Sequence, residues 1–153
     1  VTIEGIAGAT DTHAVHQRTE PTVMNGVVES GTQAFEMAGI EPAGIDIAEL
    51  HDMFTILEFL QMEGLGFAEP GRAWEQVMNG RTRRGGALPI NTSGGLKSKG
   101  HPLGATGVAQ AVELYEQLTG RAGDRQVEAD TGLACNVGGF GNCVTTTVLE
   151  GAR

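Results

Sequence analysis

Hydrophobic positions along the chain alternate between two spacings, and the order of these segments predicts an α/β fold. Short apolar runs typical of strands cover residues 1–9, 45–50, 88–91, 127–135 and 143–149. Apolar residues at helical spacing cover residues 21–38, 53–64 and 105–118, with a shorter helix at 73–78. The order βαβαβαββ predicts one domain with a five-stranded, mostly parallel mixed sheet, helices on both faces and an antiparallel last strand.

A dense group of glycines leads into the last long helix, in the stretch Gly94–Gly107, and this stretch contains His101. Glycines let the backbone approach a ligand closely. The helix that follows presents free N–H groups and a positive dipole end. Both properties suit a developing negative charge, so we predict that His101 has a functional role.

Three predicted strand ends carry reactive side chains. His51 follows the strand at 45–50, His101 follows the strand at 88–91, and Cys135 ends the strand at 127–135. Ligands of parallel sheets gather beyond the carboxyl ends of the strands, so convergence of these groups predicts thiol or proton-transfer chemistry beside backbone oxyanion donors. For His51 and for Cys135, the pattern alone supports a functional and a structural role equally. Asp52 is interpreted as a cap of the following helix.

Composition narrows the classes of function. The chain has 153 residues, 40% of them hydrophobic, and a net charge of −9, which argues against binding to nucleic acid or to an anionic membrane. Neither the pair Cys135 and Cys143 nor the pair His13 and His16 has the further ligands of a metal site, so we predict no metal and reduced thiols in a cytoplasmic protein. Because Val1 starts directly in a predicted strand, we expect an N-terminal part to be missing.

Three motifs, in matching order and spacing, resemble the signatures of thiolases. Gly100-His-Pro-Leu-Gly-Ala-Thr-Gly107 resembles the GHPxGATG signature, preceded by a similar segment at Asn91-Thr-Ser-Gly-Gly95, and Cys135-Asn-Val-Gly-Gly-Phe-Gly141 resembles CxGGGxG. His51-Asp-Met-Phe54 stands where many thiolases have Asn-Glu-Ala-Phe, and its His-Asp form is like that of sterol-carrier and archaeal-type thiolases. The resemblance implies that residues 1–153 form a thiolase-like C-terminal domain, without the N-terminal half that holds the nucleophilic cysteine.

The resemblance also implies Claisen chemistry on coenzyme A thioesters. His101 matches the histidine that activates the nucleophilic cysteine and stabilises the enolate oxygen. Cys135 matches the cysteine that moves the proton at the substrate α-carbon, and His51 completes the first oxyanion hole through a water. The second hole matches the backbone N–H groups at Val137 and Gly138.

Further residues and partners follow from the same resemblance. Four residues are implied to line the substrate and coenzyme A site, namely Ser93, Gly94, Gly95 and Phe54. The expected substrate is a coenzyme A thioester, with no permanently bound cofactor. The expected partners are the N-terminal thiolase half, further copies in a homodimer or tetramer, and a small zinc-containing protein. The chain alone is expected to be inactive, and its acyl specificity and direction of reaction stay open.

Three alternatives compete with this interpretation. A ketoacyl synthase would agree with Lys97-Ser98 near the glycine-flanked histidine, but that family has no cysteine at the place of Cys135. A sterol side-chain aldolase of the same fold is expected to use a tyrosine, and the single Tyr115 lies in the middle of a predicted helix. A non-catalytic subunit that binds acyl carriers or a partner protein would need neither the cysteine nor the two histidines.

Overall fold

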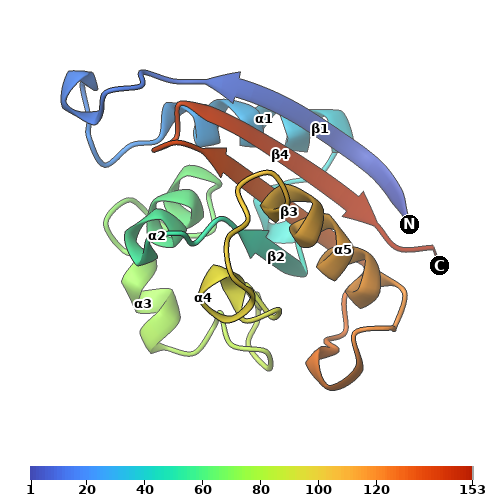
Figure 1. Cartoon of the computed structure of the whole chain (residues 1–153). Helices are drawn as coiled ribbons and strands as arrows, with labels where there is room; N and C mark the ends of the chain where they lie inside the picture. Colours follow the sequence, from blue (N-terminus) through green and yellow to red (C-terminus); the bar gives the residue numbers. More distant parts are fainter. Residues whose placement is uncertain (153) are drawn as a thin grey trace.

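The computed structural model describes residues 1–152 and shows one mixed sheet with helices on both faces (Figure 1). The strands are β1 (Thr2–Thr10), β2 (Ile47–Leu50), β3 (Thr131–Gly138) and β4 (Cys143–Glu150). The helices are α1 (Asn25–Ala38), α2 (Thr55–Gly64), α3 (Ala73–Met78), α4 (Gly95–Lys99) and α5 (Thr106–Leu118). No helix within this described range combines the length and the apolar character needed to cross a membrane.

The order of strands across the sheet is β1-β4-β3-β2. β4 runs antiparallel to both of its neighbours, whereas β2 and β3 are parallel. β1, β2 and β3 therefore point in one direction, and only the last strand is reversed, as the sequence predicted.

The predicted strand at 88–91 is reduced to a single bridge, so the sheet has four strands over residues 1–152 instead of the predicted five. Ile90 pairs with Ala48 in parallel orientation. The Ala48 N–H donates to Pro89 O at 3.0 Å, and the Asn91 N–H donates to Ala48 O at 2.9 Å. The pairing stops there because proline has no N–H to donate and Asn91 turns the chain with a φ of 54°.

Each face of the sheet has its own core. The larger core lies against α1 and α2, and the smaller one lies under α5. Side chains of successive β3 residues point alternately into the two cores: Leu133 and Cys135 belong to the larger core, and Ala134 belongs to the smaller one. The Cys135 side chain therefore faces α1, and the next residue, Asn136, faces α5.

α1 begins four residues later than the predicted start at residue 21. Pro21 lies in a turn that the Val23 N–H closes on Glu20 O at 3.0 Å. Gly26, in the first turn of α1, lies so close to the β3–β4 connection that a Cβ there would be 3.0 Å from Gly141 O. The start of the helix is thus determined by its contact with a segment far away in the sequence.

β3 is shifted toward the C-terminus relative to the prediction. The Asp46 carboxylate accepts the N–H groups of Asp130 and Thr131, both at 2.9 Å, and the strand begins there. It continues to Gly138 because these last residues pair with β4. Cys135 lies inside the strand, so the predicted position of this cysteine at a strand end is wrong.

Candidate functional site

The glycine turn before α5 is held by Asp52 of the His-Asp motif. Asp52 Oδ1 accepts the Leu96 N–H at 2.9 Å, in the first turn of α4. Gly95 has a φ of 64°, and a Cβ at this position would overlap the Asp52 carboxylate. Asp52 therefore caps α4, a helix that the sequence did not predict, instead of the helix that directly follows the motif.

A buried carboxylate anchors the same turn from β2. Glu49 is fully buried, and Ser93 Oγ donates to its Oε2 at 2.7 Å. Lys99 Nζ lies 3.1 Å from the same oxygen and donates to Ser93 Oγ at 2.8 Å. Burial raises the pKa of the Glu49 carboxyl, against the opposing effects of Lys99 and Ser93. Ser93, one of the residues predicted to line the substrate site, is therefore firmly attached to the sheet.

The structure brings His51 and His101 together. His51 directly follows β2 and is only 2% exposed. Its N–H donates to Gln61 Oε1 at 3.0 Å, and its carbonyl accepts from Gln61 Nε2 at 2.7 Å. The ring centroids of the two histidines are 4.9 Å apart, and the rings are nearly perpendicular at 86°. Two of the predicted catalytic residues thus form one site at the carboxyl end of β2.

The His51 ring is neutral near pH 7. Burial lowers the pKa of His51 to about 4, and the charge of His101 adds to this effect while Asp52 opposes it. Its Nδ1 lies 3.3 Å from Asn136 Nδ2, whereas its Nε2 is buried without a hydrogen-bond partner among residues 1–152. An unpaired buried polar atom costs about 1–3 kcal/mol. The Nε2 atom therefore marks a place for a water or a polar ligand atom.

His101 is oriented by the first turn of α5. Its Nδ1 lies 2.7 Å from Thr106 Oγ1, and this hydroxyl is 3.5 Å from Pro102 O. When the hydroxyl donates to the Pro102 carbonyl, its oxygen accepts an N–H from His101 Nδ1. This arrangement leaves Nε2 of His101 free to accept a proton.

A cavity of ≈ 460 Å³ opens beside His101. Its lining consists of Asp52, Met53, Phe54, Thr55, Glu58, Leu96, Lys97 and His101. The Phe54 ring, from the predicted substrate-binding set, stacks on Phe140 with centroids 5.8 Å apart. Burial raises the pKa of the Glu58 carboxyl, and the charge of Asp52 raises it further. The cavity therefore combines the apolar ring of Phe54 and the cationic Lys97 with the side chains of Glu58 and His101, which can exchange protons.

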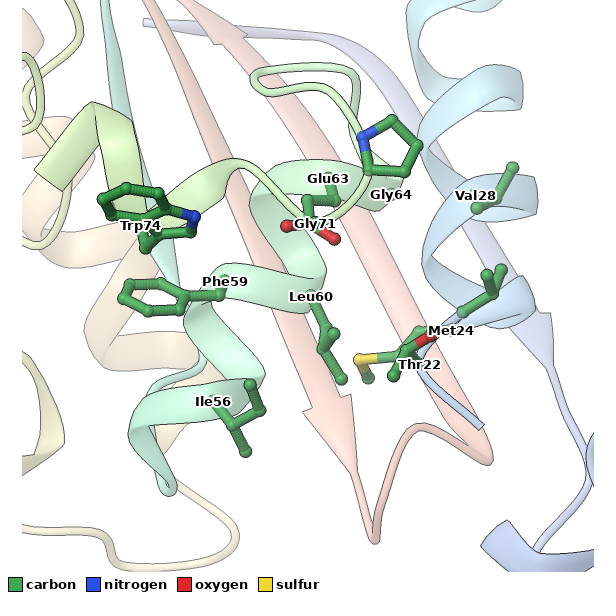
Figure 2. A pocket seen from close by; sticks show the side chains of 12 residues that line it. Thr22, Met24, Val28, Ile56, Phe59, Leu60, Glu63, Gly64, Gly71 and Trp74 are labelled. Atoms are coloured by element: carbon green, nitrogen blue, oxygen red, sulfur yellow. The ribbon is translucent and has the colours of Figure 1, made fainter. Parts of the chain in front are cut away.

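A second cavity, of ≈ 380 Å³, lies between α1, α2 and the segment that leads into α3 (Figure 2). Trp74, Phe59 and Leu60 make its wall apolar. Its one charged residue, Glu63, already accepts the Ala73 N–H at 3.1 Å. This cavity offers no group for catalysis. Over the described part of the chain, no cluster of three or more histidine, cysteine or carboxylate side chains is placed to hold a metal ion.

The structure does not bring Cys135 to the histidine pair. Its side chain is fully buried in the core under α1, where Thr146 Oγ1 donates to Sγ at 3.7 Å. Burial raises the pKa of the Cys135 thiol to about 12. Val137 and Gly138 pair with β4 and have no β2 residue opposite them, because β2 ends at the partner of Cys135. The acid–base role of Cys135 and the oxyanion role of the two backbone N–H groups stay predictions.

Sequence reasoning missed two amides that contact this site. Gln110 of α5 is buried, and its Nε2 donates to Glu49 O and Cys135 O, both at 3.1 Å. Asn136 Nδ2 donates to Gln110 Oε1 at 3.1 Å. Gly107 leaves room for this contact, since a Cβ there would lie 3.2 Å from the Asn136 side-chain carbon. A glutamine on the buried side of an amphipathic helix was the available signal.

The comparisons with known proteins agree with this fold and these motifs. Residues 7–151 match the family model described as "Thiolase C-terminal domain-like". The chain is 46% identical over 151 residues to an acetyl-CoA acetyltransferase of Methanothermobacter thermautotrophicus. This alignment covers 98% of the chain and 39% of that protein. It is 47% identical over 123 residues to the sterol carrier protein 2 of Homo sapiens, over 80% of this chain and 22% of that protein.

A solved structure shows the same fold. An aldolase described as "Ltp2-ChsH2(DUF35) aldolase" superposes with a TM-score of 0.87 at 26% identity, over 99% of this chain and 39% of the solved chain. The chain thus spans well under half the length of the proteins that it resembles. The family model nevertheless covers nearly all of this chain, so the chain belongs to the thiolase C-terminal domain-like family.

Proposed function

We propose that this chain is the C-terminal catalytic half of a thiolase-type acyltransferase, which makes or cleaves 3-ketoacyl-CoA. The observation that carries the proposal is the histidine pair, in which a neutral His51 has a buried Nε2 without a hydrogen-bond partner in residues 1–152 and lies beside His101. The similarity to acetyl-CoA acetyltransferases over 98% of the chain supports a coenzyme A thioester as the substrate.

In this proposal His101 acts at two steps and His51 at one of them. His101 Nε2 takes the thiol proton of a cysteine outside this chain, and the thiolate then attacks the 3-keto carbonyl of the substrate. The bond between C2 and C3 breaks, acetyl-CoA leaves as an enolate that takes up a proton, and coenzyme A thiol then releases the acyl group from the cysteine. His51 Nε2, through a water, and His101 together stabilise the enolate oxygen of the departing acetyl-CoA.

Cys135 is proposed as the group that protonates the enolate, with the N–H groups of Val137 and Gly138 as donors to the oxyanion that forms when the thiolate attacks the keto carbonyl. The raised pKa of Cys135 suits a proton donor and not a nucleophile. The geometry supports this assignment less than those of the histidines, because the sulfur lies in the core under α1. The neighbouring cavity is the proposed place for the thioester, with Phe54 as its apolar wall; Gly94 and Gly95 directly precede its lining residue Leu96 in the chain.

The nucleophilic half is proposed to cover the outer face of α5. This face carries Val108, Val112 and Tyr115, which are 65%, 50% and 45% exposed and recur at helical spacing. An apolar stripe of this kind is typical of an interface with another domain or protein. Without that half, we expect no turnover from this chain. A homo-oligomer and a small zinc-containing partner complete the proposal; the solved aldolase, which is described together with a DUF35 protein, supports the partner.

The aldolase function is the second candidate, because an aldolase has the same fold. Its expected tyrosine is not placed for catalysis here. Tyr115 lies nine residues after Thr106 in α5, which corresponds to about 14 Å along the helix axis from the end beside His101. The guanidinium of Arg121 lies over its ring at 5.9 Å instead.

A fusion protein tests the proposed function. The N-terminal part of the Methanothermobacter thermautotrophicus relative is joined to this chain, and cleavage of acetoacetyl-CoA by free coenzyme A is followed. We expect turnover in the fusion, none in the separate chain, and a loss in kcat on the order of 10³-fold for His101→Ala. His16→Ala, at an exposed position in the short 3₁₀ helix Val15–Gln17, serves as the matched control. Turnover that is unchanged by His101→Ala would contradict the proposed role of this histidine.

A further inference from the structure

We infer that the side-chain amides of Gln110 and Asn136 hold the proton of His51 on Nε2, which makes both of them positioning residues for the oxyanion donor. The inference about the proton stands on geometry alone, and its catalytic meaning rests on the proposed function. It concerns residues from three elements, α5, β3 and the end of β2.

The argument starts at two backbone carbonyls. Glu49 O and Cys135 O lie side by side in the parallel pair β2–β3, and Gln110 Nε2 is 3.1 Å from each of them. Carbonyl oxygens can only accept hydrogen bonds, so the NH₂ group of Gln110 must face them. The Gln110 side chain is only 1% exposed, and its Oε1 therefore has one fixed direction, toward Asn136.

The second step fixes the amide of Asn136. Because Gln110 Oε1 is an acceptor, the atom that lies 3.1 Å from it must be the Nδ2 of Asn136. An NH₂ group has two hydrogens, and the same Nδ2 lies 3.3 Å from His51 Nδ1. The Asn136 amide thus presents its second N–H to the ring of His51.

The third step determines the tautomer of His51. A neutral imidazole has one N–H and one lone pair, and only the lone pair can face the N–H of Asn136. Nδ1 is therefore the acceptor, and the proton lies on Nε2. A ring protonated on Nδ1 would place two donors against each other and would turn an acceptor toward the oxyanion.

The surrounding structure holds the ring in place for this task. Gln61 binds both backbone polar groups of His51, and Gly107 leaves the space that the Asn136 amide occupies. The only unpartnered polar atom of the ring, Nε2, is also the one that carries the proton in this arrangement. The two adjacent strand carbonyls thus determine, through two amides, which ring nitrogen donates at the site.

NMR on the wild-type chain tests the tautomer without substrate. Histidine side chains are labelled with ¹⁵N, and the His51 signals are identified by their absence in His51→Asn. Long-range proton–nitrogen correlations distinguish a protonated ring nitrogen from an unprotonated one. We expect a protonated Nε2 and an unprotonated Nδ1 at neutral pH. A proton on Nδ1 in the wild-type chain would overturn the inference, whether or not the protein is a thiolase.

Asn136→Asp tests the positioning role, because it replaces the donor by an acceptor of the same shape. We expect the His51 proton to move to Nδ1, and kcat in the fusion assay to fall on the order of 10²-fold. KM for acetoacetyl-CoA should stay within about threefold, since Asn136 does not bind the substrate. Asn79→Asp adds the same charge at an exposed position and should leave both values unchanged.

The outcomes separate the two proposals. An Asn136→Asp protein that keeps the wild-type tautomer and the wild-type kcat overturns the positioning role. A wild-type fusion without turnover refutes the proposed function alone, because the NMR result still decides where the proton lies.

Discussion

The buried ring of His51 makes the stability of the chain depend on pH. Its side chain is 2% exposed, and its pKa falls from the ordinary 6.5 to about 4. Burial is the main cause, followed by the charge of His101, while Asp52 opposes both. We therefore expect acidification to lower the free energy of unfolding.

The sign follows from the difference between the two states. In the unfolded chain His51 takes up a proton below pH 6.5, whereas the folded chain resists protonation until about pH 4. The contribution of this ring is therefore fully present above pH 6.5 and is lost as the pH falls toward 4. Two pH units within this window correspond to about 2.7 kcal/mol. Solvent screening of the charge of His101 reduces the expected loss to about 2 kcal/mol.

Urea unfolding at about pH 7.5 and about pH 4.5 measures this loss in the free energy of unfolding. The same two measurements on His51→Asn remove the titrating ring, and carboxylates that titrate in both proteins cancel in the comparison. We expect the wild type to lose about 2 kcal/mol more than His51→Asn between the two pH values. His13→Asn, in an exposed loop, should lose as much as the wild type. Equal losses in the wild type and in His51→Asn would refute the reasoning.

Two further predictions concern the cysteines and the glycine turn. Iodoacetamide at about pH 8 should modify the exposed Cys143 and spare Cys135, because the Cys135 thiol is buried and has a raised pKa. Mass spectrometry measures the modification of each cysteine, and equal modification of both would contradict the prediction. Gly95→Ala should lower the free energy of unfolding by about 3 kcal/mol, because its φ is positive and its Cβ would meet Asp52. Gly71→Ala has a similar φ in open space and should cost only about 1 kcal/mol; equal losses would exclude the contact with Asp52 as a cause.

The sequence predicted most of the helices and strands, because hydrophobic spacing reflects the period of a helix or a strand; the strand at 88–91 and the helix α4 are the exceptions. α3 was predicted with its observed bounds, and the reversed direction of the last strand was predicted correctly. The glycine motif made His101 a candidate site residue, which stays a prediction, and the family that the motifs indicated is confirmed. Boundaries were wrong where a distant group sets them, as Asp46 does for the start of β3.

Only the tertiary structure decided which side chains of the motifs meet. Because β3 continues past Cys135 to Gly138, its successive residues face opposite ways, with Cys135 in the core under α1 and Asn136 on the side of α5. The predicted fifth strand failed because proline cannot donate to a ladder. The link from Gln110 through Asn136 to His51 joins positions far apart in the chain. A local sequence pattern cannot predict such a contact, because the three side chains come together only when α5 packs on the sheet.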